Sequence, residues 1–224
     1  MSADSVREMF SSIAGRYDLA NSVLSMGIHH SWRRKLISVV PADPSLSALD
    51  LCTGTGDLLP LLMERFGKVT GADFCLPMLE IARQKPSCKG ASIVQADALN
   101  LPFADGSFDI VTVAFGVRNF ADLDRGLAEI WRVLKPGGSM LILEFGQPKN
   151  RLFGWLYNCY CRYLMPLIGG ALTGNRAAYQ YLPETAKNFP CRQEFIAILE
   201  RHGFQQCSFQ SLTGGIAYCY QARK

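Results

Sequence analysis

The chain has 224 residues, of which 49% are hydrophobic and 19% charged, and this balance predicts one globular domain with a substantial core. Its formal net charge of +4, from 23 basic and 19 acidic residues, is too small and too dispersed to indicate a nucleic-acid partner. The eight cysteines include no Cys-x-x-Cys pair and are accompanied by only three histidines, so we expect reduced thiols, a cytoplasmic protein and no metal site.

Residues 1–46 are predicted to form a helical lid ahead of the sheet. Apolar residues fall at helical spacing over 6–13, and a second helix around Trp32 is expected to end at Pro41. Between them, residues 15–32 are dense in hydrogen-bonding side chains. This segment is either a solvated loop anchored by its tryptophan or a lid over a pocket, and its composition favours the lid.

A glycine turn at residues 49–57 is the segment around which the chain is organised. A short apolar strand containing Asp50 leads into Gly54 and Gly56, and leucines at helical spacing follow. Such a turn lets a ligand lie against bare backbone at the carboxyl edge of a sheet. A dinucleotide fingerprint needs a third glycine where Leu59 stands, so the turn suits a nucleoside without a pyrophosphate. A plain strand–turn–helix connection is the alternative.

Two further strands lead into acidic residues. Residues 68–74 end at Asp73, about twenty residues after Gly54, where a carboxylate can accept hydrogen bonds from two ribose hydroxyls. Residues 92–98 carry Asp97, placed to accept from an exocyclic amine of a base. Either acid alone is equally well explained as a helix N-cap. Their joint spacing instead predicts a pocket for an adenosine-like ligand.

The core from 47 to 146 alternates strands with helices. A helix over 77–83, a strand over 108–114, a helix over 123–134 stopped by Lys-Pro-Gly-Gly, and a strand over 139–145 follow the acidic strands. Near-continuous apolar strands between helices predict a parallel sheet covered on both faces. Residues 191–224 add a helix and an antiparallel hairpin.

Residues 147–190 form an aromatic, apolar insertion. Pro166 and a glycine pair interrupt it, so no span of about twenty apolar residues exists and a transmembrane helix is rejected. The insertion is either packed core, or a greasy wall for a long hydrophobic substrate, or a patch touching a membrane surface.

Four separated motifs carry a family resemblance over nearly the whole chain. The sequence resembles the class I S-adenosylmethionine-dependent methyltransferases, and within them the quinone-biosynthesis C-methyltransferases acting on demethylmenaquinol or on the ubiquinone precursor benzoquinol. The motifs are Tyr17-Asp18 through Asn21 with Leu24-Ser25, His29 and Trp32; residues 115–119; residues 132–138 with Leu143-Glu144; and residues 212–215.

This resemblance implies a single Rossmann-like domain over 1–224, with a mostly parallel seven-stranded sheet, helices on both faces and an antiparallel C-terminal hairpin. It implies S-adenosylmethionine as cofactor and S-adenosylhomocysteine as product. Ala114 stands where relatives often have serine, so a side-chain hydrogen bond to the cofactor is missing there. The implied cofactor residues are Asp50, Gly54, Thr55, Gly56, Asp73, Phe74, Asp97, Ala98 and Ala114.

The implied reaction is C-methylation of a prenylated quinol ring, demethylmenaquinol to menaquinol. Benzoquinol methylation, small-molecule O- or N-methylation and a noncatalytic prenyl-lipid binding protein are the alternatives. A homodimer and a peripheral position at the inner face of the membrane are left open.

An aromatic C–H is a poor nucleophile, so removing a hydroquinone proton must activate the ring carbon. Arg118 and Asn119 follow the fourth strand, beside the expected methyl site. Arg118 is predicted to steady the phenolate or to orient a water, because its guanidinium is always protonated; a salt bridge at the strand end is the alternative. His29 is the conventional base candidate. Tyr17 joins the catalytic set, and Asn21 and Tyr179 are expected to contact the quinol or close the lid.

Overall fold

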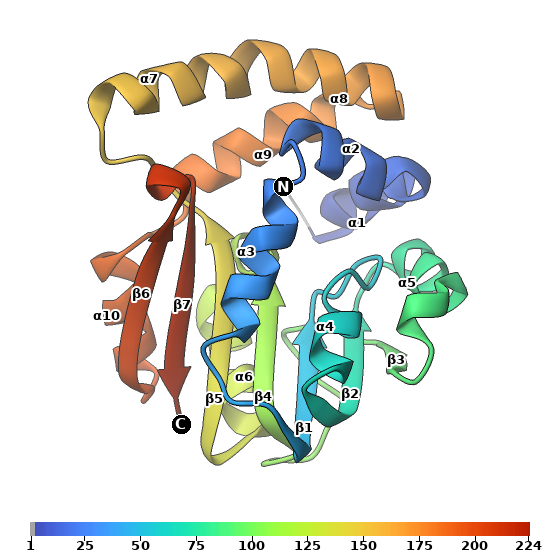
Figure 1. Ribbon diagram of the computed structural model, residues 1–224, viewed down its shortest axis with the longest axis vertical. Coiled ribbons are helices and arrows are strands. Elements are labelled where there is room, and N and C mark those ends of the chain that lie inside the picture. The colour runs from blue at the N-terminus through green and yellow to red at the C-terminus, as the bar shows by residue number, and fades with distance from the viewer. Residues whose placement is uncertain (1–2) are drawn as a thin grey trace.

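Within the computed structural model, which describes residues 3–224, seven strands form one twisted sheet with helices on both faces (Figure 1). The strands are β1 (Asp43–Leu51), β2 (Phe66–Asp73), β3 (Ser92–Gln95), β4 (Phe108–Ala114), β5 (Leu134–Phe145), β6 (Gln205–Leu212) and β7 (Ala217–Arg223).

The sheet order is β3-β2-β1-β4-β5-β7-β6. All neighbours from β3 to β5 pair in parallel, and β7 pairs antiparallel with both β5 and β6. The predicted mostly parallel sheet with an antiparallel C-terminal hairpin is therefore confirmed. The chain runs outward in opposite directions from β1 and from β4, which makes their carboxyl ends the topological switch point where ligands bind in such sheets.

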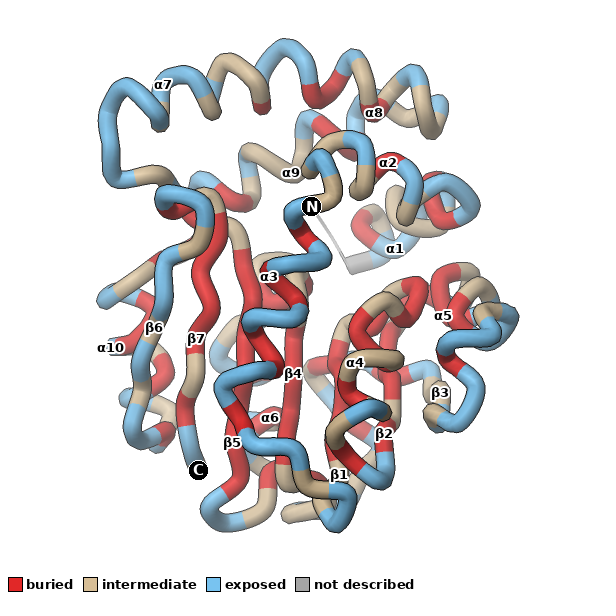
Figure 2. The backbone as a smooth tube through the Cα atoms, viewed as in Figure 1, coloured by how far each residue is buried: buried red, intermediate tan, exposed pale blue. Residues whose placement is uncertain are grey.

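Helices cover the two faces because successive strand residues point to opposite sides. In β1, Ala48 packs with α3 and α4, whereas Leu49 and Leu51 pack with α6 and α10. Figure 2 shows long buried stretches in β4, β5 and β7, whereas the edge strand β6 is mostly exposed. The helices are α1 (Ala3–Ile13), α2 (Tyr17–Leu24), α3 (Ile28–Ile37), α4 (Leu59–Met63), α5 (Leu76–Gln84), α6 (Leu123–Val133), α7 (Arg151–Cys159), α8 (Met165–Thr173), α9 (Arg176–Asn188) and α10 (Gln193–Arg201).

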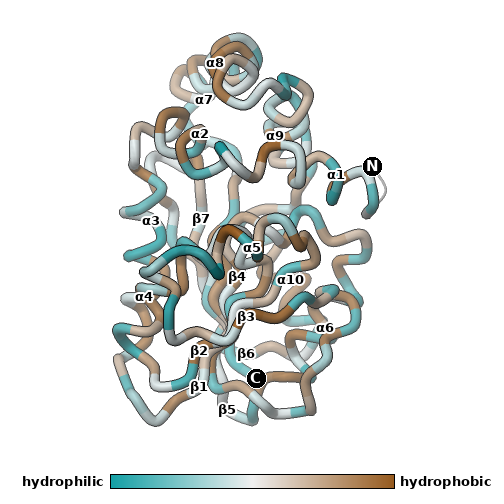
Figure 3. Tube along the Cα trace, turned by 90° about the vertical axis from the view of Figure 1, so that its right-hand side faces the viewer, coloured by the Kyte–Doolittle hydropathy of each residue, from teal (hydrophilic) through white to brown (hydrophobic). Residues whose placement is uncertain are grey.

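A helical layer lies across the carboxyl end of the parallel strands. It combines α1 and α2 with the insertion, in which α7 continues through a π-helical segment, Tyr160–Leu164, into α8. Segments remote in sequence share one core there: Ile13 and Ala20 pack with Cys161 and Met165. Figure 3 shows α7 and α8 at the outer edge of this layer. Among the helices formed by residues 3–224, none combines the length and apolar character needed to cross a bilayer.

Residues 17–24 form helix α2, within the segment for which a solvated loop was the alternative to a lid. One local expectation is corrected. The fifth strand begins at Leu134 and not at 139, because Leu134 already pairs with Phe108 and the Lys-Pro-Gly-Gly segment is an irregularity within β5. Gly137 provides the left-handed turn at this irregularity, with φ of +77°.

Candidate functional site

Two cavities lie between the sheet and the helical layer. The sheet-edge cavity, of about 480 Å³, is lined by α1 and by the residues that end β1, β2, β3 and β4. The lid cavity, of about 580 Å³, is lined by α2, α3, α7 and the end of β5. Tyr17 and Phe115 line both cavities. A ligand in one can therefore meet a ligand in the other at these two aromatic side chains.

Unusual backbone conformations mark the switch point. Cys52 after β1 and Phe115 after β4 have φ of 57° and 61°, a left-handed region that costs free energy for side chains of this kind. Gly54 lies in the same region, with φ of +55°, and a Cβ placed there would meet no protein atom within 4 Å. The turn thus presents bare backbone to the sheet-edge cavity, as the sequence predicts.

Asp73 is the most constrained carboxylate of this cavity. Its Oδ2 accepts a hydrogen bond from the Gly54 backbone N–H at 2.9 Å, and its Oδ1 accepts one from the Cys75 N–H at 2.8 Å. Burial raises the pKa of this carboxyl group above its usual value. A carboxylate has about four acceptor positions, so Asp73 retains capacity for hydroxyl donors of a ligand.

Six of the nine predicted cofactor residues line the sheet-edge cavity; they are Gly54, Asp73, Phe74, Asp97, Ala98 and Ala114. The structure does not bring the other three, Asp50, Thr55 and Gly56, to its wall.

These three residues instead support the turn. Asp50 is buried and accepts hydrogen bonds from Thr53 at 2.6 Å and Thr112 at 2.7 Å; burial raises its pKa to about 6, against the opposing effect of these two bonds. A Cβ at Gly56 would lie 2.8 Å from Cys88 Sγ. Gly56 thus allows close packing below the turn.

Thr55 connects the turn to the lid. Its hydroxyl donates to Asp18 of α2 at 2.5 Å, and Lys85 pairs with Asp18 at 2.6 Å and with Asp57 at 2.8 Å. We call Asp18, Thr55, Asp57 and Lys85 the lid clasp. No sequence pattern pointed to Lys85, because it follows the predicted helix 77–83 as an ordinary surface lysine would.

Arg118 forms the salt bridge that was its alternative interpretation, and its catalytic role stays a prediction. Its Nη1 pairs with Glu144 Oε1 at 2.8 Å, and the exposed fractions of the two side chains are 5% and 0%. The guanidinium also lies over the Phe145 ring, at 5.3 Å from its centroid. Arg118 nevertheless lines the lid cavity, and its buried Nε has no hydrogen-bond partner within the described chain. One donor therefore remains for a ligand.

The other predicted catalytic and substrate residues divide in three ways. Tyr17, Asn21 and His29 line the lid cavity. Asn119 lines the sheet-edge cavity and accepts a hydrogen bond from Tyr181 at 3.2 Å. Tyr179 lines neither, because its ring packs against Gly169 inside the helical layer. The aromatic residues that α7 and its continuation bring to the lid cavity are Phe153, Tyr157 and Tyr160. They belong to the insertion for which a wall for a hydrophobic substrate was one of three interpretations.

His29 does not have the ordinary titration that made it a base candidate. It is 4% exposed, and burial, with help from Arg33 and His30, lowers its pKa to about 4. Its imidazole is therefore neutral at physiological pH and is a weak proton acceptor.

Relatives carry the same architecture. A model of the ubiE/COQ5 methyltransferase family matches residues 1–224. A ubiquinone/menaquinone biosynthesis C-methyltransferase UbiE of Bdellovibrio bacteriovorus is 44% identical, covering 96% of this chain and 94% of that protein. A demethylmenaquinone methyltransferase of Thermus thermophilus is 46% identical, covering 93% of this chain and 96% of that protein. A SAM-dependent methyltransferase from Thermotoga maritima has the same fold, with a TM-score of 0.68 at 19% identity over 97% of this chain and 99% of that chain. The family model matches the whole chain, and both sequence relatives are more than 40% identical over nearly their full length. The chain therefore belongs to the ubiE/COQ5 methyltransferase family.

Proposed function

We propose that this protein transfers a methyl group from S-adenosylmethionine to a ring carbon of a prenylated quinol, converting demethylmenaquinol to menaquinol. The observation that carries the proposal is the contact of two unlike cavities at Tyr17 and Phe115. One cavity presents carboxylates and open backbone, and the other is mainly aromatic and apolar. The names of the Thermus and Bdellovibrio relatives support the quinol as acceptor.

The sheet-edge cavity fits the adenosine part of S-adenosylmethionine. Asp73 and Asp97 both line this cavity, which supports contacts with ribose hydroxyls and with an exocyclic amine, and the open face of Gly54 leaves room for the ligand. S-Adenosylmethionine supplies an activated methyl group on a positively charged sulfur. The protein's part is to align this donor with the acceptor carbon and to exclude water, and the lid clasp holds α2 over the turn for this purpose.

The lid cavity fits a hydroquinone ring. Phe115 and Phe145 stack with ring centroids 4.5 Å apart, and Trp32 lies beside them at 6.2 and 6.4 Å. Arg118 offers a positive charge and a free donor for the phenolate that forms when a hydroxyl proton leaves. Burial raises the pKa of Tyr17, the largest of several effects on it, so this phenol stays protonated.

The test is methyl transfer with a labelled donor and reduced demethylmenaquinol. We expect the label on the ring carbon, and a loss of about a hundredfold or more in Arg118→Ala, as removal of one stabilising donor costs in other sites. Arg34→Ala is the matched control, since Arg34 is exposed on α3. Label on an oxygen or nitrogen would identify a different acceptor, and no transfer from the wild-type protein would refute the proposal. A parallel reaction with the benzoquinol separates the two quinol classes.

We further propose that α7 and α8 rest on the inner face of an anionic membrane. Apolar side chains of α7 and α8 are exposed, with exposed fractions of 69% for Leu152, 62% for Trp155 and 55% for Leu167. Figure 2 shows most of α7 as exposed. No acidic residue occurs between Glu144 and Glu184. Apolar residues with basic neighbours are typical of interfacial helices; the basic ones here are Lys149, Arg151, Arg162 and Arg176.

This surface adjoins the lid cavity. Phe153 and Leu156 line that cavity while remaining 37% and 53% exposed, so a prenyl tail can pass from lipid to the ring site. Cosedimentation with phosphatidylglycerol vesicles should fall about tenfold in Trp155→Glu. Val39→Glu is the control, because Val39 is exposed between α3 and β1, away from the helical layer. Vesicle binding that is unaffected by Trp155→Glu would refute membrane contact through α7 and α8. If Trp155→Glu instead dissociates a dimer, this surface binds a second copy of the chain.

A further inference from the structure

We propose that His29 distinguishes the reduced quinol from the oxidised quinone, by accepting a hydrogen bond at Nε2 from a ring hydroxyl that only the reduced form carries. The inference rests on the proposed function, and it gives His29 a role in recognition rather than in proton removal.

The tautomer of His29 follows from its neighbour Ser25. The Ser25 hydroxyl lies 2.7 Å from the Asn21 carbonyl oxygen and 2.5 Å from His29 Nδ1. A carbonyl oxygen cannot donate, so two oxygens at 2.7 Å require the hydroxyl proton between them. Because a hydroxyl has only one proton, Nδ1 must donate to Ser25. A neutral imidazole with its proton on Nδ1 has a lone pair on Nε2.

That lone pair has no donor in the protein. Nε2 is buried and lacks a hydrogen-bond partner within the described chain, while His29 is 4% exposed and lines the lid cavity. The nearest cationic group of the same helix, Arg33, faces Asp57 at 3.4 Å and makes no hydrogen bond with His29. Buried acceptors are rarely left unpaired in folded proteins. A donor from a ligand that displaces the side chains covering Nε2 would complete the site.

The cavity also holds an unpaired donor, Nε of Arg118. A hydroquinone can supply both complements, since one oxygen can carry a proton toward His29 and another can accept from Arg118. A quinone has two carbonyl oxygens and no hydroxyl, so it can satisfy Arg118 but leaves the His29 lone pair facing acceptors only. Sites built around a ligand hydroxyl reject analogues that lack it, because a buried group is then left unpaired. This selection suits the chemistry, because only the reduced ring is electron-rich enough to take the methyl group.

The experiment measures binding rather than turnover. Dissociation constants of a short-tailed 2-prenyl-1,4-naphthoquinone and of its dithionite-reduced quinol are determined anaerobically, without methyl donor, from the quenching of tryptophan fluorescence. We expect the wild-type protein to prefer the quinol by about tenfold to a hundredfold. His29→Phe keeps an aromatic ring without an acceptor, and the preference should fall toward onefold, mainly through weaker quinol binding. His29→Gln places an amide oxygen near the position of Nε2 and should retain part of the preference.

Equal affinities of the wild-type protein for the two forms would overturn the inference, whatever the variants do. A preference that survives unchanged in His29→Phe would overturn it as well. The binding experiment contains no methyl donor, so it is independent of the methylation assay. If the protein selects the quinol but the methylation assay shows no label transfer, the proposed function is wrong and the role of His29 in recognition stands. Binding of neither form would remove both.

Discussion

The buried pair of Arg118 and Glu144 makes a stability prediction that separates charge from packing. Glu144→Gln should leave the shape of the site nearly unchanged. Both the Arg118 Nη1 bond and the Phe145 backbone N–H bond go to Oε1 of Glu144, at 2.8 Å each, and an amide oxygen can accept both. Only the longer bond from the Arg118 backbone N–H to Oε2, at 3.2 Å, is lost outright.

The expected cost is that of an unneutralised buried cation. The exposed fractions of the two side chains, 5% and 0%, leave little solvent to screen Arg118 once its partner is neutral. Breaking such a pair typically costs about 3–5 kcal/mol, whereas replacing both members by apolar groups is often neutral. The double variant Arg118→Met/Glu144→Gln should therefore recover most of the loss, although it should not transfer methyl groups.

Urea unfolding of the wild type, both single variants and the double variant gives the coupling free energy as a double-mutant cycle. Asp124→Asn is the matched control, because its pair with His202 includes a carboxylate that is 75% exposed and such pairs contribute less than about 1 kcal/mol. If Glu144→Gln unfolds within 1 kcal/mol of wild type, or if adding Arg118→Met gives no recovery, the buried-charge reasoning is wrong.

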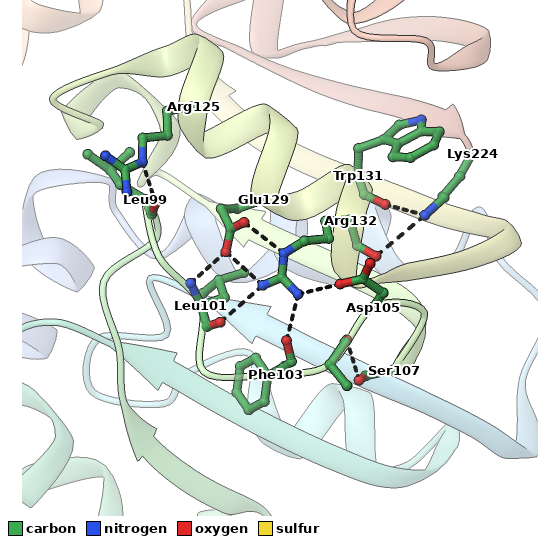
Figure 4. Close-up of polar contacts among 11 residues, drawn as sticks. Leu99, Leu101, Phe103, Asp105, Ser107, Arg125, Glu129, Trp131, Arg132 and Lys224 are labelled. Atoms are coloured by element: carbon green, nitrogen blue, oxygen red, sulfur yellow. Dashed lines mark hydrogen bonds and ion pairs between the residues drawn. The ribbon is translucent and has the colours of Figure 1, made fainter.

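Four further outcomes are expected. Asp18→Asn should speed amide hydrogen exchange in the α2 backbone and raise KM for S-adenosylmethionine by about tenfold, because it opens the lid clasp. Asp50→Asn should stabilise the protein relative to wild type at pH 7.5 but not at pH 4.5, with a difference of up to about 3 kcal/mol in urea unfolding. The sign follows because the folded carboxyl, with a pKa of about 6, keeps a proton between pH 4 and 6 that the unfolded chain has released. Arg132→Ala should cost about 2 kcal/mol in thermal unfolding, because its guanidinium joins α6 to the loop after β3 (Figure 4). Calorimetry should show that Gly54→Ala weakens S-adenosylmethionine binding and lowers the melting temperature through backbone strain alone, because φ at Gly54 is +55°. Gly56→Ala should lower the melting temperature further, because φ there is +81° and its Cβ also meets protein atoms.

The sheet could be predicted because its strands are apolar runs separated by helices, a pattern with few topological solutions. Assigning side chains to cavity walls was harder. Asp50 and Asp73 both lie at strand ends, yet Asp50 points between strands toward Thr112, and Asp73 faces the cavity. Which way a strand-end residue points depends on the register of neighbours far away in sequence.

The helical layer was less predictable for a different reason. Helical periodicity fixes a face only while the helix is regular, and the π-helical segment Tyr160–Leu164 changes the phase between α7 and α8. Phe153, Tyr157 and Tyr160 reach the lid cavity at regular helical spacing, before the phase changes, while Tyr179 of α9 is buried between helices. His29 illustrates a further limit of the sequence. It was chosen as a base from the ordinary pKa of histidine, and the sequence does not show the burial that lowers the pKa of this side chain.

The helical layer across the strand ends has a consequence for how this family can diversify. Its insertion, residues 147–190, packs mainly on α1, α2 and itself, and it contributes no residue to the sheet-edge cavity. The part that we propose meets the acceptor's tail can therefore be exchanged between homologues as a module, with the donor-binding half left as it is. A graft of this segment from a relative that handles longer tails should change tail-length preference and leave the affinity for the methyl donor unaltered.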